Sequence, residues 1–230
     1  MASKNVFNEE GRLLQIEFAI KNVSKAGTII GVVCSNGVVL LGINKEEIKT
    51  QREKIYPITD NIYIALCGLF GDAMLLKKYA QITAQDTLEM YDQDASLLSV
   101  IKAVSKKKQL FTQYAQTRPF GVSFLYAGME NDEFRLYSTD PAGTINQWKG
   151  VAYGENEDGI NKGLRNEYPE GDIDMERGTV ELIKILSKVV ECGTKESSRL
   201  EILHYGENNI KYLSREEIKK ILEDVENMPK

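Results

Sequence analysis

Residues 27–43 read GTIIGVVCSNGVVLLGI, two apolar runs that meet at Ser35-Asn36-Gly37. Asn-Gly accepts the positive φ angles that a tight hairpin turn demands. The runs 28–34 and 38–43 therefore predict a β-hairpin. Each run is apolar at nearly every position, so these strands are expected to be buried.

The sequence before this hairpin has helical periodicity. Residues 9–25 carry apolar side chains at intervals of three and four. Asn8 is a candidate N-cap, Glu9 and Glu10 would lie in the first turn, and Gly27 lies beyond the end. We expect an amphipathic helix here. Its apolar positions are Leu13, Ile16, Ile20 and Val23.

The rest of the chain alternates groups of strands with pairs of helices. Hairpins interrupted by helix pairs fit two stacked sheets covered by helices on both outer faces. The sequence thus predicts an α+β fold, a four-layer α-β-β-α sandwich of two antiparallel sheets with an extra N-terminal helix. Further strands are expected at 54–58, 62–67, 122–127, 134–138, 144–153, 199–205 and 209–213. Further helices are expected at 72–91, 96–116, 159–168, 175–192 and 215–225, the last capped by Ser214.

Composition limits the class of protein. With 42% apolar and 27% charged residues, the chain has the balance of an ordinary globular protein. A net charge of -5 argues against nucleic acid, because the one basic run, 106–108, is small for phosphate binding. No apolar run approaches the roughly 18 residues of a membrane span, and the N-terminus lacks the pattern of a signal peptide. The odd set Cys34, Cys67 and Cys192 predicts reduced thiols in an intracellular protein.

We expect residues 1–230 to form one domain, with a short tail at 1–6, a helix at 9–25 and the sandwich at 27–230. No repeat or linker divides it. No cofactor is expected. The single histidine, His204, has no neighbouring pattern typical of a metal site or a catalytic triad, and a structural role is expected for it.

Four short sequences are more specific than the pattern of strands and helices. They are FNEEGRLLQIEFA at 7–19, Thr112-Gln113, RPFGVS at 118–123 and DPAG at 140–143. Together they resemble the α-type subunits of the proteasome core particle, in order and over nearly the whole chain. The resemblance implies the fold of the N-terminal-nucleophile hydrolases. Among the paralogues the chain is most similar to alpha type-4. The strings behind that finer similarity are AGT at 26–28, KIY at 54–56 and VSFLYAG at 122–128.

The resemblance also bears on catalysis. The β-type subunits of the same particle cut peptides with an N-terminal Thr, helped by an Asp and a Lys. Matching the hairpins at Gly37 places Gly27 at the nucleophile, Ile43 at the acid and Lys54 at the lysine. Two of the three groups are missing. We therefore expect no catalytic residue and a non-catalytic subunit of a threonine-type endopeptidase complex.

Two alternatives stay open at the level of sequence. The weaker is a homo-oligomeric shell protein unconnected to proteolysis, and the other is a hydrolase. Processing between Gly27 and Thr28 would free Thr28 as the nucleophile of an autonomous N-terminal-nucleophile hydrolase. Counting from Thr28 places Asn44 at the acid position, and an amide cannot carry the charge.

Lys54 is the candidate binding residue. A single lysine entering a strand is more commonly solvated. By resemblance, however, the matching lysine of α subunits lies in a pocket between neighbouring subunits and pairs with the C-terminal carboxylate of an activator tail. Ala26 is expected to line the same pocket.

The resemblance assigns the N-terminal segment to the substrate entry pore and to assembly of a heptameric ring. The positions concerned are Phe7, Asn8, Gly11, Arg12 and Phe18.

This segment also departs from the family. No Tyr-Asp-Arg precedes Phe7, Asn8-Glu9 replaces a Ser-Pro pair, and Phe18 replaces a Tyr. We expect this subunit to contribute little to pore closure. Arg12 and Arg118 are candidate donors of interface ion pairs, or locally structural arginines.

The implied partners are neighbouring α subunits, β-type subunits, an ATPase regulatory cap or other activators, and unfolded protein substrates in transit. No nucleic acid and no membrane are among them. The implied role is scaffolding of ring assembly for ubiquitin-dependent protein degradation, in the cytoplasm and nucleus.

Overall fold

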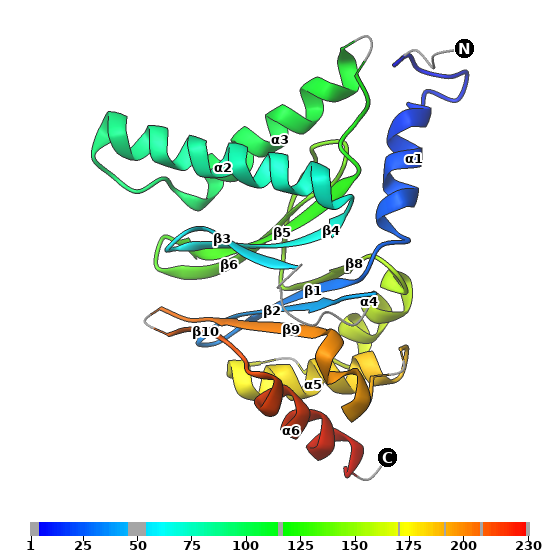
Figure 1. Ribbon diagram of the computed structural model, residues 1–230, viewed down its shortest axis with the longest axis vertical. Helices are drawn as coiled ribbons and strands as arrows, with labels where there is room; N and C mark the ends of the chain where they lie inside the picture. Colours follow the sequence, from blue (N-terminus) through cyan, green and yellow to red (C-terminus); the bar gives the residue numbers. More distant parts are fainter. Residues whose placement is uncertain are drawn as a thin grey trace.

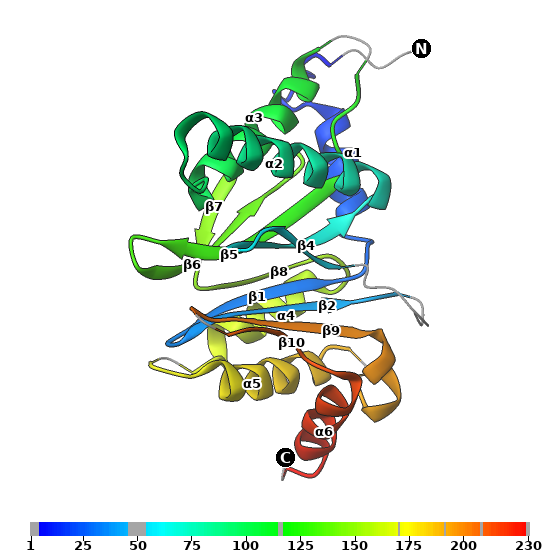
Figure 2. The same cartoon turned by 60° about the vertical axis from the view of Figure 1, so that its left-hand side comes forward.

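The computed structural model describes residues 5–45, 54–114, 117–169, 171–190, 192–207 and 209–228. Two antiparallel sheets lie face to face, and helices cover the outer face of each (Figures 1 and 2). The predicted four-layer α-β-β-α sandwich is confirmed.

The first sheet contains the hairpin predicted at residues 28–43. Its strand order is β10-β9-β2-β1-β8, and every neighbouring pair is antiparallel. The predicted hairpin is present, but its turn lies one residue earlier than expected. Ser35 and Asn36 form the turn, Gly37 is already paired with Cys34, and neither Asn36 nor Gly37 has a positive φ. The strands are β1 Ile29–Cys34, β2 Gly37–Ile43, β8 Gly150–Tyr153, β9 Leu200–Tyr205 and β10 Ile210–Tyr212.

The second sheet has the order β3-β4-β5-β6-β7, again antiparallel throughout. Its strands are β3 Ile55–Thr59, β4 Ile62–Gly68, β5 Val122–Glu130, β6 Glu133–Thr139 and β7 Ile145–Trp148.

Helices α2 and α3 cover the second sheet, whereas α4, α5 and α6 cover the first (Figure 1). The extra helix α1 stands at one side of the sandwich and contacts β4 and β5. The bounds are α1 Leu14–Val23, α2 Phe70–Tyr91, α3 Leu97–Gln113, α4 Glu157–Asn166, α5 Met175–Ser187 and α6 Arg215–Glu226, with a 3₁₀ helix at Thr194–Arg199.

Each space between layers has its own apolar core. Side chains such as Ile29, Leu40 and Leu125 fill the space between the sheets. A strand in the middle of such a stack is buried on both faces, so its sequence is apolar without alternation. All seven residues of β2 are buried, which explains the continuous run that predicted it.

One predicted strand is wrong. Residues 144–153 form two strands that belong to different sheets, because β7 pairs with β6 and β8 pairs with β1. Lys149 lies at the crossing, and its carbonyl accepts the N–H of Val33 at 2.7 Å. Strand composition alone cannot show that a chain passes from one sheet to the next.

The predicted end of α5 is also wrong, since this helix stops at Ser187 and not at 192. The 3₁₀ helix after it was not predicted. The expected strand at 199 begins at Leu200. The expected end of α3 at 116 lies outside the described residues, whereas the predicted cap Ser214 is confirmed and accepts the N–H of Glu217.

Helix α1 is shorter than predicted, and Asn8 is not its N-cap. The helix begins at Leu14, after an N-cap residue that makes no side-chain cap. Asn8 instead closes a turn, since its Oδ1 accepts the N–H groups of Glu10 and Arg12 at 3.1 and 2.8 Å. Gly11 has φ +75°, a left-handed conformation that glycine adopts without steric cost. The pattern of Asn followed by Glu-Glu is therefore a turn signal here.

Candidate functional site

The three positions matched to a catalytic centre meet at one end of the sandwich, where β1 begins, β2 ends and β3 begins. Lys54 lies just before β3, is only 7% exposed, and its Nζ donates a hydrogen bond to the Gly27 carbonyl oxygen at 2.9 Å. The Ile43 carbonyl oxygen lies where a side chain on Gly27 would begin. The hairpin register therefore brings Gly27, Ile43 and Lys54 together as predicted.

Gly27 has no room for a side chain. A Cβ built on it would overlap the Ile43 carbonyl oxygen and lie 3.1 Å from Lys54 Nζ. Carbon atoms in real structures do not approach backbone oxygen that closely, so any side chain requires the backbone to move. The position lacks a nucleophile, and the packing around it leaves no space for a nucleophilic side chain.

Thr28, the alternative nucleophile, is buried with its hydroxyl already used. Its Oγ1 donates to the backbone carbonyl of Glu155 at 2.7 Å. The residue matched to its acid, Asn44, donates from Nδ2 to Glu201 Oε1 at 3.1 Å and carries no charge. This geometry does not favour catalysis by Thr28.

Cys67 is the other nucleophilic group nearby, and it is inert. Burial raises its pKa to about 12 although the charge of Lys54 lowers it. Its Sγ donates to the Val23 carbonyl at 3.5 Å. A thiol with so high a pKa holds almost no thiolate at neutral pH.

Two further residues shape this site and were missed from the sequence. Glu201 on β9 accepts the backbone N–H groups of Lys54 and Ile55 with Oε2, at 3.3 and 3.2 Å. Gly154 has φ +111°, and a Cβ there would lie 2.9 Å from Cα of Thr28. The available signal for Glu201 was a carboxylate inside an apolar strand, which is costly unless it is hydrogen-bonded.

The described ranges contain no group of three or more His, Cys, Asp or Glu residues placed to hold a metal ion. Within the same ranges no helix has the length and apolar content that crossing a bilayer requires. All three cysteines have free thiols, Cys34 and Cys67 being buried.

The family model described as "Proteasome subunit" matches residues 23–204, which include the whole of this site. The chain belongs to the proteasome subunit family.

Curated relatives place this proteasome subunit among the α-type members. It is 57% identical to the probable proteasome subunit alpha type-3 of Encephalitozoon cuniculi over 221 residues, 96% of this chain and 95% of that protein. Proteasome subunit alpha type-3 of Saccharomyces cerevisiae is 35% identical over 229 residues, 94% and 88% of the two chains. Proteasome subunit alpha type-4-A of Arabidopsis thaliana is 34% identical over 203 residues, 86% and 81% of the two chains. The α type is confirmed, and the similarity extends to both type-3 and type-4.

Of the remaining predicted residues of this proteasome subunit, Ala26 lies beside the Lys54 site and the others lie in or before α1. Ala26 is half-buried beside Gly27, and its carbonyl accepts the N–H of Glu155 at 2.9 Å. Phe7 precedes α1 and Phe18 lies in the middle of it, and they are 71% and 59% exposed. The predicted residues thus form two groups, one beside Gly27 and one along the N-terminal segment and α1.

The N-terminal group is tied to the end of α3. Asn5 Nδ2 donates to the carbonyl oxygens of Tyr114 and Thr117, at 3.0 and 3.2 Å. Residues 1–4 of the predicted tail lie outside the described residues. Figure 1 shows the start of the described chain near the end of α3.

The two arginines considered as interface donors differ. Arg118 forms a two-pronged pair with Asp72, with Nη1–Oδ2 at 2.6 Å and Nη2–Oδ1 at 2.8 Å. Burial alone would raise the pKa of Asp72, but the bonds from Arg118 and the Gly121 N–H lower it. Arg118 is therefore locally structural, whereas Arg12 is exposed in the turn closed by Asn8.

Proposed function

We propose that this chain is a non-catalytic subunit of the α ring of the proteasome core particle. The observation that carries the proposal is Gly27, which stands at the nucleophile position and is packed so that no side chain fits there. A threonine hydrolase needs a side-chain oxygen and a free amine at this point. The burial of Thr28 and its bond to Glu155 argue against the hydrolase alternative.

Lys54 is proposed to bind the C-terminal carboxylate of an activator tail, with Ala26 beside it. Three observations support this. The ammonium is held at the end of the sandwich by the Gly27 carbonyl. Lys54 as a whole is 7% exposed, whereas Lys108 in the interior is 0% exposed. Its neighbours Ala26 and Gly27 add almost no side-chain volume. A cation in such a partly enclosed place attracts a carboxylate more strongly than one in open water.

The N-terminal segment is proposed to serve ring assembly and the entry pore. Leu14 and Phe18 of α1 and Phe7 before it are apolar and exposed. Exposed apolar surface of this kind is typical of a protein–protein interface. A closed ring needs two complementary flanks on each subunit, so this surface is proposed to contact a neighbouring α subunit. We keep the hypothesis that this subunit contributes little to pore closure.

The wider setting is proposed from the family. The partners are other α subunits, β-type subunits, an ATPase regulatory cap or other activators, and unfolded protein in transit. Residues 1–230 are proposed to act as one domain, without a cofactor, in the cytoplasm and nucleus.

The experiment uses core particles reconstituted with Lys54→Met or with Lys184→Met. Methionine keeps much of the aliphatic stem of lysine, and Lys184 lies on α5, where it pairs with Glu181. Binding of an activator with a free C-terminal carboxylate is measured for each. We expect weaker binding for Lys54→Met, by about tenfold for one lost ion pair, and unchanged binding for Lys184→Met. Equal binding by both particles would refute the role of Lys54.

A further inference from the structure

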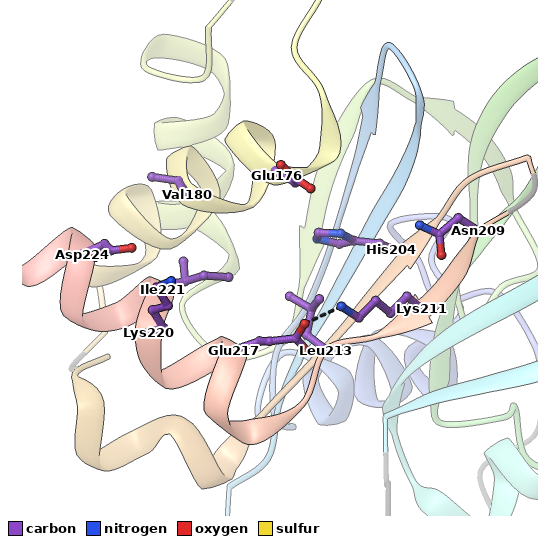
Figure 3. Close-up of a pocket in the computed structure, with 10 residues that line it drawn as sticks. All are labelled: Glu176, Val180, His204, Asn209, Lys211, Leu213, Glu217, Lys220, Ile221 and Asp224. Carbon is purple, nitrogen blue, oxygen red and sulfur yellow. Dashed lines mark hydrogen bonds and ion pairs between the residues drawn. The ribbon is translucent and has the colours of Figure 1, made fainter.

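A cavity of about 360 Å³ lies between α5, α6 and the β9–β10 hairpin. Its volume is within the range of about 300–1,000 Å³ that is usual for small-ligand pockets. It is on the helix-covered face of the first sheet, whereas the Lys54 site lies between the sheets. Figure 3 shows His204 on the strand side of this space and Glu176 on the helix opposite.

The hydrogen bonds of Thr179 fix the tautomer of His204. The hydroxyl of Thr179 has one hydrogen, which it donates to the Met175 carbonyl at 2.7 Å. The same oxygen lies 2.7 Å from His204 Nε2, so Nε2 must donate to it. In a neutral ring Nδ1 is then an acceptor. Nδ1 has no hydrogen-bond partner among the described residues, although His204 is only 8% exposed.

The charges that face His204 are mostly negative. Asp174 and Glu176 belong to α5 and its N-cap, Glu217 belongs to α6, and Lys211 on β10 is the cation. Lys211 is paired with Glu217. Burial lowers the pKa of His204, and it outweighs the carboxylates, which raise that pKa. The ring is therefore neutral at pH 7. The charged residues that line the cavity, three carboxylates and two lysines, therefore sum to one negative charge, and the neutral imidazole does not offset it.

The remaining wall is partly apolar. Val180 of α5, Leu213 before α6 and Ile221 of α6 supply the apolar part, and Asn209, Lys220 and Asp224 supply the polar part, the last two with opposite charges. A ligand that fits has an aliphatic stem and a positive head with several N–H donors. A guanidinium has five such donors in a planar fork and is more weakly hydrated than an ammonium.

We propose that this cavity binds the side chain of an arginine carried by a partner protein segment, with His204 Nδ1 and the Glu176 carboxylate accepting from its guanidinium. The stem lies against Val180, Leu213 and Ile221. The cavity is separate from the Lys54 site. A failure of the activator-docking proposal would therefore not refute arginine binding here, and the reverse also holds.

The test uses the imidazole of His204, because this is the only histidine of the chain. The full chain is labelled with ¹⁵N-histidine, and the ring nitrogens are followed by NMR. Before any ligand is added, we expect the tautomer with hydrogen on Nε2. Addition of an acetylated and amidated Ala-Arg-Ala peptide is expected to shift Nδ1 with saturation. The matched Ala-Gln-Ala peptide is expected to leave it unchanged.

Two variants and one small cation complete the design. Glu176→Gln is expected to weaken the arginine peptide about tenfold, as for the loss of one hydrogen bond to a charged group. Glu181→Gln, on the same helix but paired with Lys184, is the matched control and is expected to bind as the unchanged chain does. An unchanged Nε2 signal in Glu176→Gln shows that the pocket is intact.

Acidification is expected to abolish binding, because protonated Nδ1 becomes a donor and the imidazolium repels the guanidinium. The proposal is overturned if Nδ1 carries the hydrogen, if the glutamine peptide shifts Nδ1 equally, or if Glu176→Gln and Glu181→Gln bind alike. Ethylguanidinium binding as tightly as the arginine peptide overturns the assignment to a protein segment.

Discussion

Lys54 and Lys108 are both buried lysines, but they lie in different surroundings. Lys108 on α3 is 0% exposed, and its Nζ donates to the Val122 carbonyl, the Thr139 carbonyl and Thr139 Oγ1 at 3.0, 3.1 and 2.9 Å. Lys54 lies at the end of the sandwich, where it is held by the Gly27 carbonyl and keeps some exposure.

The two lysines differ in what surrounds the ammonium. Three acceptors from β5 and β6 bind the ammonium of Lys108, so that lysine joins α3 to the sheet. The ammonium of Lys54 donates to the Gly27 carbonyl at the end of the sandwich, beside residues with small side chains.

The largest effect is expected from Gly27→Ala, which tests the packing on which the comparison depends. The added methyl overlaps the Ile43 carbonyl. Where the surroundings have no room to relax, overpacking of this kind lowers the free energy of unfolding by about 3 kcal/mol. Gly71→Ala is the control, because a Cβ there meets nothing within 4 Å and the position is helical. It is expected to gain about 0.5–1 kcal/mol. The free energy of unfolding of both variants is measured in denaturant. Equal values for the two would contradict the tight packing described around Gly27.

An intermediate effect is expected from Lys108→Met, and it depends on pH. Burial lowers the pKa of Lys108 to about 7 from its ordinary 10.5. Between these values the unfolded chain binds a proton that the folded chain does not, so lysine at this position gains stability as pH rises. Methionine removes the hydrogen bonds from Lys108 to the Val122 and Thr139 carbonyls, which costs about 2 kcal/mol once the lysine is neutral in both states.

The cost of Lys108→Met should therefore grow from pH 7 to pH 10.5. Unfolding is measured across that window and compared with Lys106→Met on the exposed side of α3. A cost that stays constant or shrinks with rising pH would show that Lys108 is not desolvated as described.

The smallest effect on stability is expected from Lys54→Met. It removes the bond to the Gly27 carbonyl and keeps most of the stem packed against Gly42, so the free energy of unfolding should fall by only about 1 kcal/mol. Thermal melts check this beside the docking assay. A fall as large as that of Lys108→Met at alkaline pH would make Lys54 a structural lysine too.

Sequence alone was sufficient where local pattern and tertiary structure agree. Asn36-Gly37 and the apolar runs beside it predicted the hairpin, and through it the positions of Gly27 and Lys54, although Ser35 and Asn36 form the turn itself. The order of strand groups and helix pairs predicted the layers.

The rest depends on contacts that sequence does not display. In the sequence, 106–108 is only a basic run too small for phosphate binding, but Lys108 is buried and Nζ of Lys107 lies 5.2 Å from the ring centroid of Tyr79. Glu201 binds backbone groups that are about 150 residues away in the chain, a pairing set by the tertiary fold. His204 was expected to be structural, and its tautomer follows only from the position of Thr179.

The central claim is that the peptide bond between Gly27 and Thr28 stays intact because this position has no catalytic use. The most direct measurement is the mass of this chain in assembled particles after treatment with a threonine-directed electrophile. We predict a chain in which Gly27 remains joined to Thr28 and which carries no label. A chain that starts at Thr28 and carries the electrophile on that residue would contradict the account.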